Sequence, residues 1–387
     1  MTNTADPRPR SAVSTGVGLA GLAGLFVWVL FARRIDASGP NAALCAVLAC
    51  GMPMVLWSLV VDKVHRNPTT GIDWDRSARP LKETLDISLV KLAGLWATWG
   101  AIAVVYATGR WYWEGSYLFA MSLLGRAAPF LLALSIPYLL WIDRRLVEPR
   151  DGAWHLGQWL IGGGRAPDVD AKEIQDHLRA WAVKGFFIAF MISIVPPGYQ
   201  DVVRLPAAEI LHDPVSLARY LMTALFVADV MFATVGYALT LRPLDAHIRS
   251  ANPYAAGWTA ALICYPPFIM MSENGPLNYH PGTADWTYWL DGRPVALAIV
   301  GAVLVVLTAI YAWGTVAFGL RFSNLTHRGI LTHGPYAWTR HPAYLSKILF
   351  WWVSGLPFFC SEGFVEGARN TAIMVLVSGV YYWRAKT

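Results

Sequence analysis

Charged residues are scarce in this sequence. Only 14% of its 387 residues are Asp, Glu, Lys or Arg, whereas soluble domains usually carry about 25%. Hydrophobic residues make up 56% of the chain, and its mean hydropathy is +0.41. So few charges cannot cover the surface of a soluble protein of this length. The composition excludes coiled-coil, collagen-like and disordered chains and indicates a multi-pass membrane protein.

Metal-binding and redox motifs are also lacking. The four cysteines include no CxxC pair, and each lies in an apolar run where it behaves as a small buried hydrophobe. The nine histidines form no HxxxH or HxxHH box. His327, His333 and His341 are close in sequence, but spacings of six and eight do not place them on one helix face. We therefore predict no metal site.

Long apolar runs dominate what is present. A helix needs roughly 20 apolar residues to cross the ~30 Å hydrocarbon layer. The fifth and seventh runs are short and contain Pro196-Pro197 and Pro266-Pro267. The prediction is an all-α, polytopic membrane helix bundle with about ten transmembrane helices, at 15–32, 41–61, 88–107, 117–141, 181–197, 216–241, 257–272, 294–318, 342–360 and 368–384.

The positive residues predict the orientation. If all ten helices cross, twenty lysines and arginines, among them Arg8 and Arg10, fall in segments on one side and six on the other. Cytoplasmic segments carry such an excess, so the N- and C-termini are predicted to be cytoplasmic. Arg33 and Arg34 are the pair that opposes this scheme. The net charge of +6 thus reflects topology in a lipid bilayer, and no nucleic-acid partner is expected.

Two local patterns belong to single helices. Gly16, Gly18 and Gly21 spell GxGxxG, but a dinucleotide site needs a preceding strand, and here the glycines lie in the first apolar run. Close helix packing is the better interpretation. In the loop before the fifth run, Asp170 and Glu173 are typical of a helix start.

Two charged residues lie near the middle of predicted spans. Arg126 belongs to the fourth run and Asp229 to the sixth. Charges at that depth are costly and usually face the bundle interior or form pairs. An Arg126–Asp229 pair is the resulting hypothesis, in a structural role or as part of a transporter or membrane scaffold.

The most informative segment is Leu325 to Lys347, with the sequence LTHRGILTHGPYAWTRHPAYLSK. Gly334-Pro335 predicts a turn, and Pro342 suits the first position of the following helix. That helix presents free backbone N–H groups and its positive dipole end beside Arg340 and His341. Together with Tyr336 and Tyr344, this end can hold a small, partly anionic cofactor.

The motif G-P-Y-x3-R-H-P-x-Y, preceded by R-G-I-L, resembles a motif of the isoprenylcysteine carboxyl methyltransferase family and its phospholipid-methyltransferase relatives. The resemblance covers 257–387 and leaves 1–250 as an N-terminal multi-pass membrane region of unknown role. In that family the segment corresponding to 325–347 binds S-adenosylmethionine at the cytoplasmic face. The resemblance implies cofactor contacts at Arg328, Gly329, Ile330, Leu331, Tyr336, Arg340, His341 and Tyr344.

The implied activity is S-adenosylmethionine-dependent methyl transfer to a lipid-like or small hydrophobic acceptor. A carboxylate such as that of isoprenylcysteine is favoured, since it is already ionised at pH 7 and needs no base. An amine acceptor would first have to lose a proton. Arg340 would hold the cofactor, and Arg384, which matches a family arginine at the substrate end, would pair with the acceptor carboxylate.

Two positions depart from the family pattern. Ser346 stands where the family often has Gly, and Arg384 is followed by Ala385-Lys386-Thr387 where the family continues with two glutamates. The second departure leaves it open whether this chain is active or truncated. The C-terminal region is also similar to membrane sterol reductases, which use NADPH. That cofactor's 2′-phosphate would need its own basic contact, and no separate cluster stands out in the sequence.

Overall fold

The computed structural model describes residue 9, residues 11–164 and residues 168–387. It is a helical molecule whose described strands, β1 (Ser250–Ala251) and β2 (Thr326–His327), form one antiparallel pair. Arg8 and Arg10, two of the residues used to predict the orientation, lie outside the described residues.

Seven helices of the described chain are long and apolar enough to cross a membrane. This finding supports a multi-pass membrane protein with an all-α bundle. They are α1 (Thr15–Arg34), α2 (Pro40–Leu56), α3 (Leu81–Gly109), α4 (Leu118–Ile142), α6 (Ala171–Arg204), α8 (Pro214–Ala238) and α11 (Pro294–Phe318). The other α-helices are α5 (Gly152–Ile161), α7 (Ala207–Ile210), α9 (Ala255–Leu262), α10 (Trp286–Trp289), α12 (Pro342–Gly355) and α13 (Phe364–Lys386).

The predicted number of ten spanning helices is not confirmed. The run 257–272 is wrong as a span, because α9 ends at Leu262 and turns follow. Proline lacks the N–H that a helix requires, and Pro266 and Pro267 lie in this stretch. The 14 residues of α12 extend only about 21 Å, short of the hydrocarbon thickness. Helix α13 is long enough but carries charged residues at both ends.

Helix α6 is longer than the predicted fifth span. Asp170 caps it by accepting a hydrogen bond from the Lys172 amide at 2.7 Å, so the predicted helix start is correct. The helix then continues through Pro196 and Pro197 to Arg204. The connecting loop and the span are therefore joined in one helix of 34 residues.

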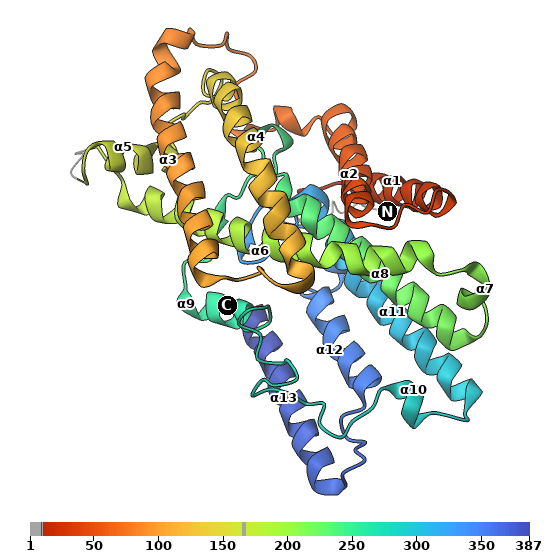
Figure 1. Cartoon of the computed structure of the whole chain (residues 1–387). Helices are drawn as coiled ribbons and strands as arrows, with labels where there is room; N and C mark the ends of the chain where they lie inside the picture. The colour runs from red at the N-terminus through yellow and green to blue at the C-terminus, as the bar shows by residue number, and fades with distance from the viewer. Residues whose placement is uncertain (1–8, 10, 165–167) are drawn as a thin grey trace, which may run out of the picture.

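Helices α6 and α8 occupy the middle of the molecule (Figure 1). On one side α3, α4 and α5 pack against α6, and on the other α11 packs against α8 and is followed by α12 and α13. Helices α1 and α2 pair with each other and contact α8. This arrangement makes α8 the most buried of the seven candidate spans.

Helix α1 uses its glycines for close packing, as the sequence predicts. Gly18 lies against the Val316 carbonyl of α11, Gly21 against Phe232 of α8, and Gly24 against the Ala49 carbonyl of α2. A side chain at any of these positions would collide with its neighbour. These contacts place α1 in the groove between three helices.

Helices α8 and α11 run parallel. Along them, Gly301 lies against Ala218, Thr315 donates a hydrogen bond to Asp229, and Gly236 lies against the Phe322 carbonyl. The chain between them, residues 239–293, must therefore run back along the full length of α8. Much of this connection is not helical. Irregular backbone at membrane depth needs protein around it. Helix α13 supplies part of this cover, since Asn370 donates to the Pro281 carbonyl at 2.7 Å.

The basic connecting segments meet at one end of the bundle. The Ala12 amide donates to the Ile330 carbonyl at 2.8 Å, and Asn252 donates to the Thr387 carbonyl at 2.8 Å. Ala12 and Thr387 thus lie beside loops that were predicted to share a side. At the other end, Arg33 donates to the carbonyls of Val202 and Leu205, which gives this arginine a structural role there.

Candidate functional site

The segment 325–347 begins as a strand and ends as a helix. Its start, β2, pairs with β1 so that Ser250 faces His327. A short 3₁₀ turn follows at Gly334–Ala337, and α12 starts at Pro342. The predicted turn and the predicted helix start are both present. The segment therefore reaches from the loop after α8 to the amino end of α12.

Arg328 fastens this segment to the bundle. Its side chain is 3% exposed, and its guanidinium donates to the carbonyls of Gly236, Phe322 and Leu320 at 2.8–2.9 Å and to that of Ala246. These carbonyls come from the end of α8, from the loop after α8 and from the residues that follow α11. With its donors engaged by main chain, Arg328 acts as a positioning residue.

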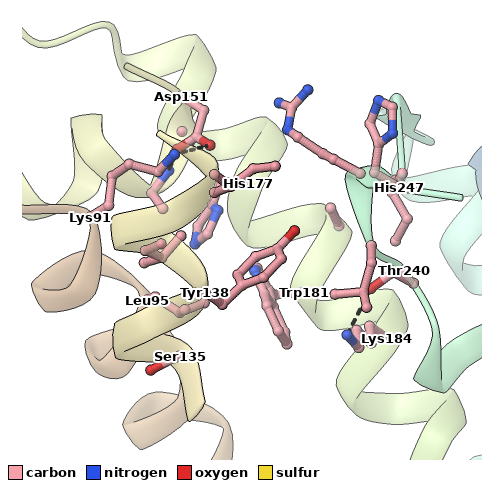
Figure 2. Close-up of a pocket in the computed structure, with 18 of the residues that line it drawn as sticks. Lys91, Leu95, Ser135, Tyr138, Asp151, His177, Trp181, Lys184, Thr240 and His247 are labelled. Atoms are coloured by element: carbon pink, nitrogen blue, oxygen red, sulfur yellow. Dashed lines mark hydrogen bonds and ion pairs between the residues drawn. The ribbon is translucent and has the colours of Figure 1, made fainter. Parts of the chain in front are cut away.

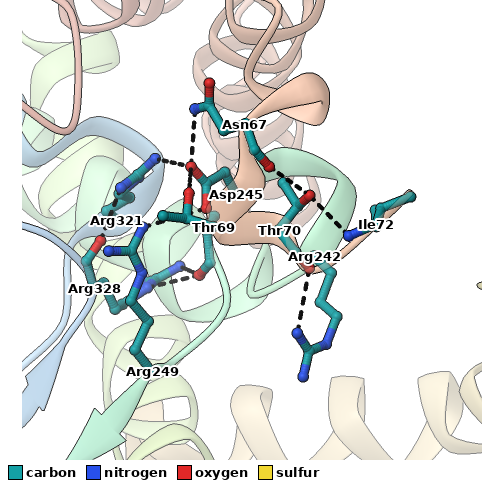
Figure 3. A network of polar contacts seen from close by, with 10 residues as sticks. Asn67, Thr69, Thr70, Ile72, Arg242, Asp245, Arg249, Arg321 and Arg328 are labelled. Carbon is teal, nitrogen blue, oxygen red and sulfur yellow. Dashed lines mark hydrogen bonds and ion pairs between the residues drawn. The ribbon is translucent and has the colours of Figure 1, made fainter. Parts of the chain in front are cut away.

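Asp245 connects the same region to the N-terminal half (Figure 3). Its carboxylate pairs with Arg321 at 2.8 Å and accepts hydrogen bonds from Asn67 at 3.0 Å and Thr69 at 2.7 Å. Burial opposes the charge, but these hydrogen bonds and the charges of Arg321 and Arg249 outweigh it, so the pKa of Asp245 is lowered. The carboxylate thus stays ionised at neutral pH.

The three residues after Arg328 face the protein core or the N-terminal segment. Gly329 has φ +116° and lies against Ala12, where a side chain would not fit. The Ile330 carbonyl accepts the Ala12 amide while its side chain is exposed, and Leu331 is buried in the core. These positions, which the resemblance assigns to the cofactor, anchor the chain in this structure.

Arg340, His341 and Tyr344 lie at the amino end of α12. Arg340 is exposed, and the rings of His341 and Tyr344 stack with centroids 5.6 Å apart and planes 4° apart. Burial and the nearby charges of Arg340 and Lys386 lower the pKa of His341. His341 is therefore neutral at pH 7. The two charged residues beside it, Arg340 and Lys386, are both positive. Tyr336 packs against Phe318 of α11, with ring centroids 5.1 Å apart.

Arg384 lies inside a ring of tyrosines that we call the aromatic cage, formed by Tyr265, Tyr344 and Tyr381. The guanidinium carbon is 5.2, 5.1 and 5.9 Å from these three ring centroids. Its Nη2 donates to the Asn324 Oδ1 at 2.8 Å and to the Tyr265 hydroxyl at 3.2 Å. Only 9% of Arg384 is exposed, and within the described chain it forms no salt bridge.

A second cation adjoins the cage. The Lys347 ammonium lies 5.1 Å from the Trp351 ring centroid and 5.5 Å from those of Tyr311 and Tyr381. Tyr381 therefore contacts both Arg384 and Lys347. On its far side Lys347 approaches Asp229, which accepts a hydrogen bond from Thr315 and is 7% exposed. Cations, tyrosines and one carboxylate thus form a continuous buried polar cluster.

The predicted Arg126–Asp229 pair is not formed. Arg126 is exposed on α4, where its Nε donates to the Ser122 carbonyl at 3.2 Å. Helix α4 packs against α3 and α6, whereas Asp229 points from α8 toward α11. Asp229 instead accepts a hydrogen bond from Thr315.

Sequence reasoning missed five members of the cluster. Two of them, Asn324 and Lys347, are polar residues beside or inside an apolar run, and this was the signal that the sequence offered. Tyr381 belongs to an aromatic triplet typical of the membrane interface, yet it is 3% exposed while its neighbour Tyr382 is 65% exposed. The missed residues are Tyr265, Tyr311, Asn324, Lys347 and Tyr381.

Comparison with known proteins gives one match. Residues 261–381 match the family described as "Protein of unknown function (DUF1295)". This range includes the motif segment and the three tyrosines of the aromatic cage but stops before Arg384. Searches of curated proteins and of solved structures gave no match.

Proposed function

We propose that this chain is a membrane enzyme that transfers a methyl group from S-adenosylmethionine to an anionic, lipid-like acceptor. The observation that carries the proposal is the buried Arg384 guanidinium, which has aromatic faces and neutral hydrogen-bond partners. A buried cation without a carboxylate partner is costly unless a ligand supplies the negative charge. An acceptor carboxylate would supply it through a bidentate pair.

The residues beside Arg384 fit the cofactor as well. S-adenosylmethionine, when bound, supplies a methyl group on a positively charged sulfur. Arg340 and the amino end of α12 would hold its carboxylate, and the stacked His341 and Tyr344 rings offer a face for its adenine. The resemblance of the motif to isoprenylcysteine methyltransferases agrees with these roles.

In this proposal the protein contributes alignment and exclusion of water. Arg384 fixes the acceptor oxygen, while the rings of the aromatic cage keep water from the reacting atoms. A carboxylate acceptor needs no general base, because it is ionised at pH 7. The positive charges of Arg340 and Lys386, at the amino end of α12, would attract an anionic acceptor toward the aromatic cage.

One observation favours a second candidate, reduction by NADPH. The fold brings Lys386 beside His341 and Arg340, which makes a basic cluster that the sequence alone did not show. Such a cluster suits the phosphates of that cofactor. Tyr311, next to Asp229 and Lys347, could then supply the proton that follows hydride transfer.

Binding measurements distinguish the two candidates. The purified protein in nanodiscs is titrated calorimetrically with S-adenosylmethionine and with NADPH. We expect binding of S-adenosylmethionine that weakens by about ten-fold or more in Arg340→Ala, since a charge-assisted contact is lost. Arg369→Ala, an exposed arginine at the far end of α13, is the matched control.

The outcomes have separate meanings. Binding of NADPH alone would replace the methyltransferase proposal with the reductase. Binding of S-adenosylmethionine that Arg340→Ala leaves unchanged would remove Arg340 from the cofactor site. Binding of neither cofactor would contradict both candidates.

A further inference from the structure

A cavity of about 630 Å³ lies outside the aromatic cage, between α3, α4, α6 and the loop that follows α8 (Figure 2). None of the cage residues lines it. Its volume is within the range of small-molecule sites, which is roughly 300–1,000 Å³. The cavity belongs to the N-terminal region, for which neither the motif nor the proposed chemistry provides a role.

The walls of the cavity are apolar toward the membrane. They are formed by Leu95 and Trp99 of α3, Leu131 and Leu134 of α4, and Trp181 of α6. Leu131 is 47% exposed and Leu134 65% exposed, so the wall continues onto the outer surface of α4. This surface belongs to a candidate membrane span. An apolar chain could therefore pass from the bilayer into the cavity beside α4.

The opposite wall holds a cation without a counter-charge. The Lys184 ammonium donates to the Thr240 hydroxyl at 2.7 Å and lies 4.6 Å from the Trp181 ring centroid (Figure 2). Among the described residues no carboxylate lies within salt-bridge distance of it. An ammonium has three donors, and the single hydroxyl engages one. Arg242 also lines the cavity, and within the part of the chain that the structure describes its side chain donates to the Thr70 carbonyl at 3.3 Å.

Most other charges of the lining are already paired. Lys91 bridges Asp143 at 2.7 Å and Asp151 at 2.9 Å, so this end is compensated. Asp176 pairs with Lys172 and Arg179. The remaining acidic residue of the lining is Glu173, whose backbone carbonyl lies beside Gly152 at the start of α5.

A neutral hydrogen-bonding group completes the cationic wall. The Nδ1 atom of His247 is buried and has no hydrogen-bond partner. Burial lowers the pKa of His247 to about 4, so the ring is neutral at pH 7. It can therefore donate or accept one hydrogen bond without adding charge to the cavity.

We propose that this cavity binds a lipid with a single apolar chain and an anionic head group, taken up from the bilayer. The head group would contact Lys184, and the chain would lie along Trp99, Leu131 and Leu134. A free inorganic anion would satisfy the cations but leave the long apolar wall in contact with water. A neutral lipid would fill the wall but leave Lys184 uncompensated.

Photolabelling tests this site directly. The purified full chain is incubated with a long-chain fatty acid that carries a diazirine on its chain, irradiated, digested and mapped by mass spectrometry. We expect saturable labelling of peptides from α3, α4 and α6. Unlabelled oleate should compete, whereas oleyl alcohol and inorganic phosphate should compete about ten-fold less well or worse.

Two variants on one helix give the matched comparison. Lys184→Gln should reduce the apparent affinity for the fatty acid about ten-fold or more, because it removes the head-group charge. Lys172→Gln, at a 77% exposed position of α6, should not change it. Lys184→Arg keeps the charge and should restore binding, which separates loss of the site from loss of the fold.

Several results would overturn the proposal. They are equal labelling of the Lys184→Gln and Lys172→Gln proteins, competition by phosphate as strong as that by oleate, and non-saturable labelling spread over the lipid-facing helices. The readout is independent of methyl transfer or reduction. Failure of this site therefore leaves the proposed function untouched, and the reverse also holds.

Discussion

At the scale of single residues, the proposed function rests on the surroundings of Arg384. Buried arginines usually pair with carboxylates, and this one has three rings, an amide oxygen and a hydroxyl around it. The arrangement keeps the guanidinium in place at a cost that an anionic ligand would offset. A residue kept for binding should be dispensable for folding.

We therefore expect Arg384→Gln to lose ligand binding while the melting temperature stays within a few degrees or rises. The amide can still donate to Asn324, and the uncompensated charge is gone. Melting temperature and binding are measured on the same preparation, with Arg369→Gln as the control on α13. A large drop in melting temperature would instead assign Arg384 to the fold.

Asp245 is the opposite case, a charge that the fold requires. Its folded pKa is lowered below the unfolded value of about 3.9, so its contribution to stability is complete above that pH and is lost as the pH falls through the folded value. Removing it leaves Arg321 buried and unpaired, which costs about 3–5 kcal/mol.

Asp245→Asn should therefore be strongly destabilised at pH 7 and lose less further stability below about pH 4 than the unchanged protein does. Thermal unfolding in detergent, followed as the pH is lowered, gives both quantities. Asp75→Asn, at an exposed loop position, should behave like the unchanged protein. Parallel acid profiles for all three proteins would show that Asp245 is not the responsible group.

Residue roles in the motif segment could be predicted only in part. The order of residue types identifies Gly334-Pro335 as a turn and Pro342 as a helix start, because these depend on local backbone preferences. It does not show that the donors of Arg328 are engaged by main-chain carbonyls or that Asp229 accepts a hydrogen bond from Thr315. Those partners come from α8 and α11, and spacing within one segment carries no information about them.

At the scale of elements, the glycines of α1 set the distance between helices. Gly24 lies so close to the Ala49 carbonyl of α2 that a Cβ would meet this oxygen at 2.0 Å. Backbone cannot move aside as a flexible side chain can. The pattern of small residues in an apolar run was sufficient to predict this packing from sequence.

Gly24→Ala should destabilise the protein by about 1–3 kcal/mol through overpacking. Gly100→Ala on α3, where nothing lies within 4 Å, is the matched control and should be neutral or slightly stabilising because alanine favours helix. Chemical denaturation in mild detergent measures both. Equal stability of the two variants would contradict the close approach of α1 and α2.

The parallel pair α8 and α11 explains why the predicted span at 257–272 failed. Hydropathy identifies apolar stretches but not the path that joins them. A return between parallel helices can be made by irregular chain when α13 covers it, as it does at Pro281. Within 257–272, Gly257, Ala260 and Ala261 are buried and α13 packs against α9, so part of this apolar stretch faces protein.

At the scale of the whole molecule, the fold places the positively charged connecting segments together at one end. Hydrogen bonds join Ala12 to Ile330 and Asn252 to Thr387, and Asp245 joins the loop at 67–69. The orientation was predicted from charge counts alone, without information about any of these contacts. Which side of the membrane this end faces stays a prediction.

Cysteine labelling tests it. Single cysteines at Arg76, Lys172 and Lys386 should react with a membrane-impermeant maleimide only in inverted vesicles, and cysteines at Glu209 and Ser361 only in right-side-out cells. The unsubstituted protein gives the background from its four native cysteines. Labelling of both groups from the same side would contradict the single-ended arrangement.

The bond between Ala12 and Ile330 also bears on the order of assembly during synthesis. Chains emerge from the ribosome at about 5–20 residues per second, so the first helix waits tens of seconds for the segment that covers its start. Throughout that interval Gly18 has no α11 to pack against. The nascent protein must therefore hold an incomplete bundle in the membrane, exposed to chaperones and proteases, until its last third arrives.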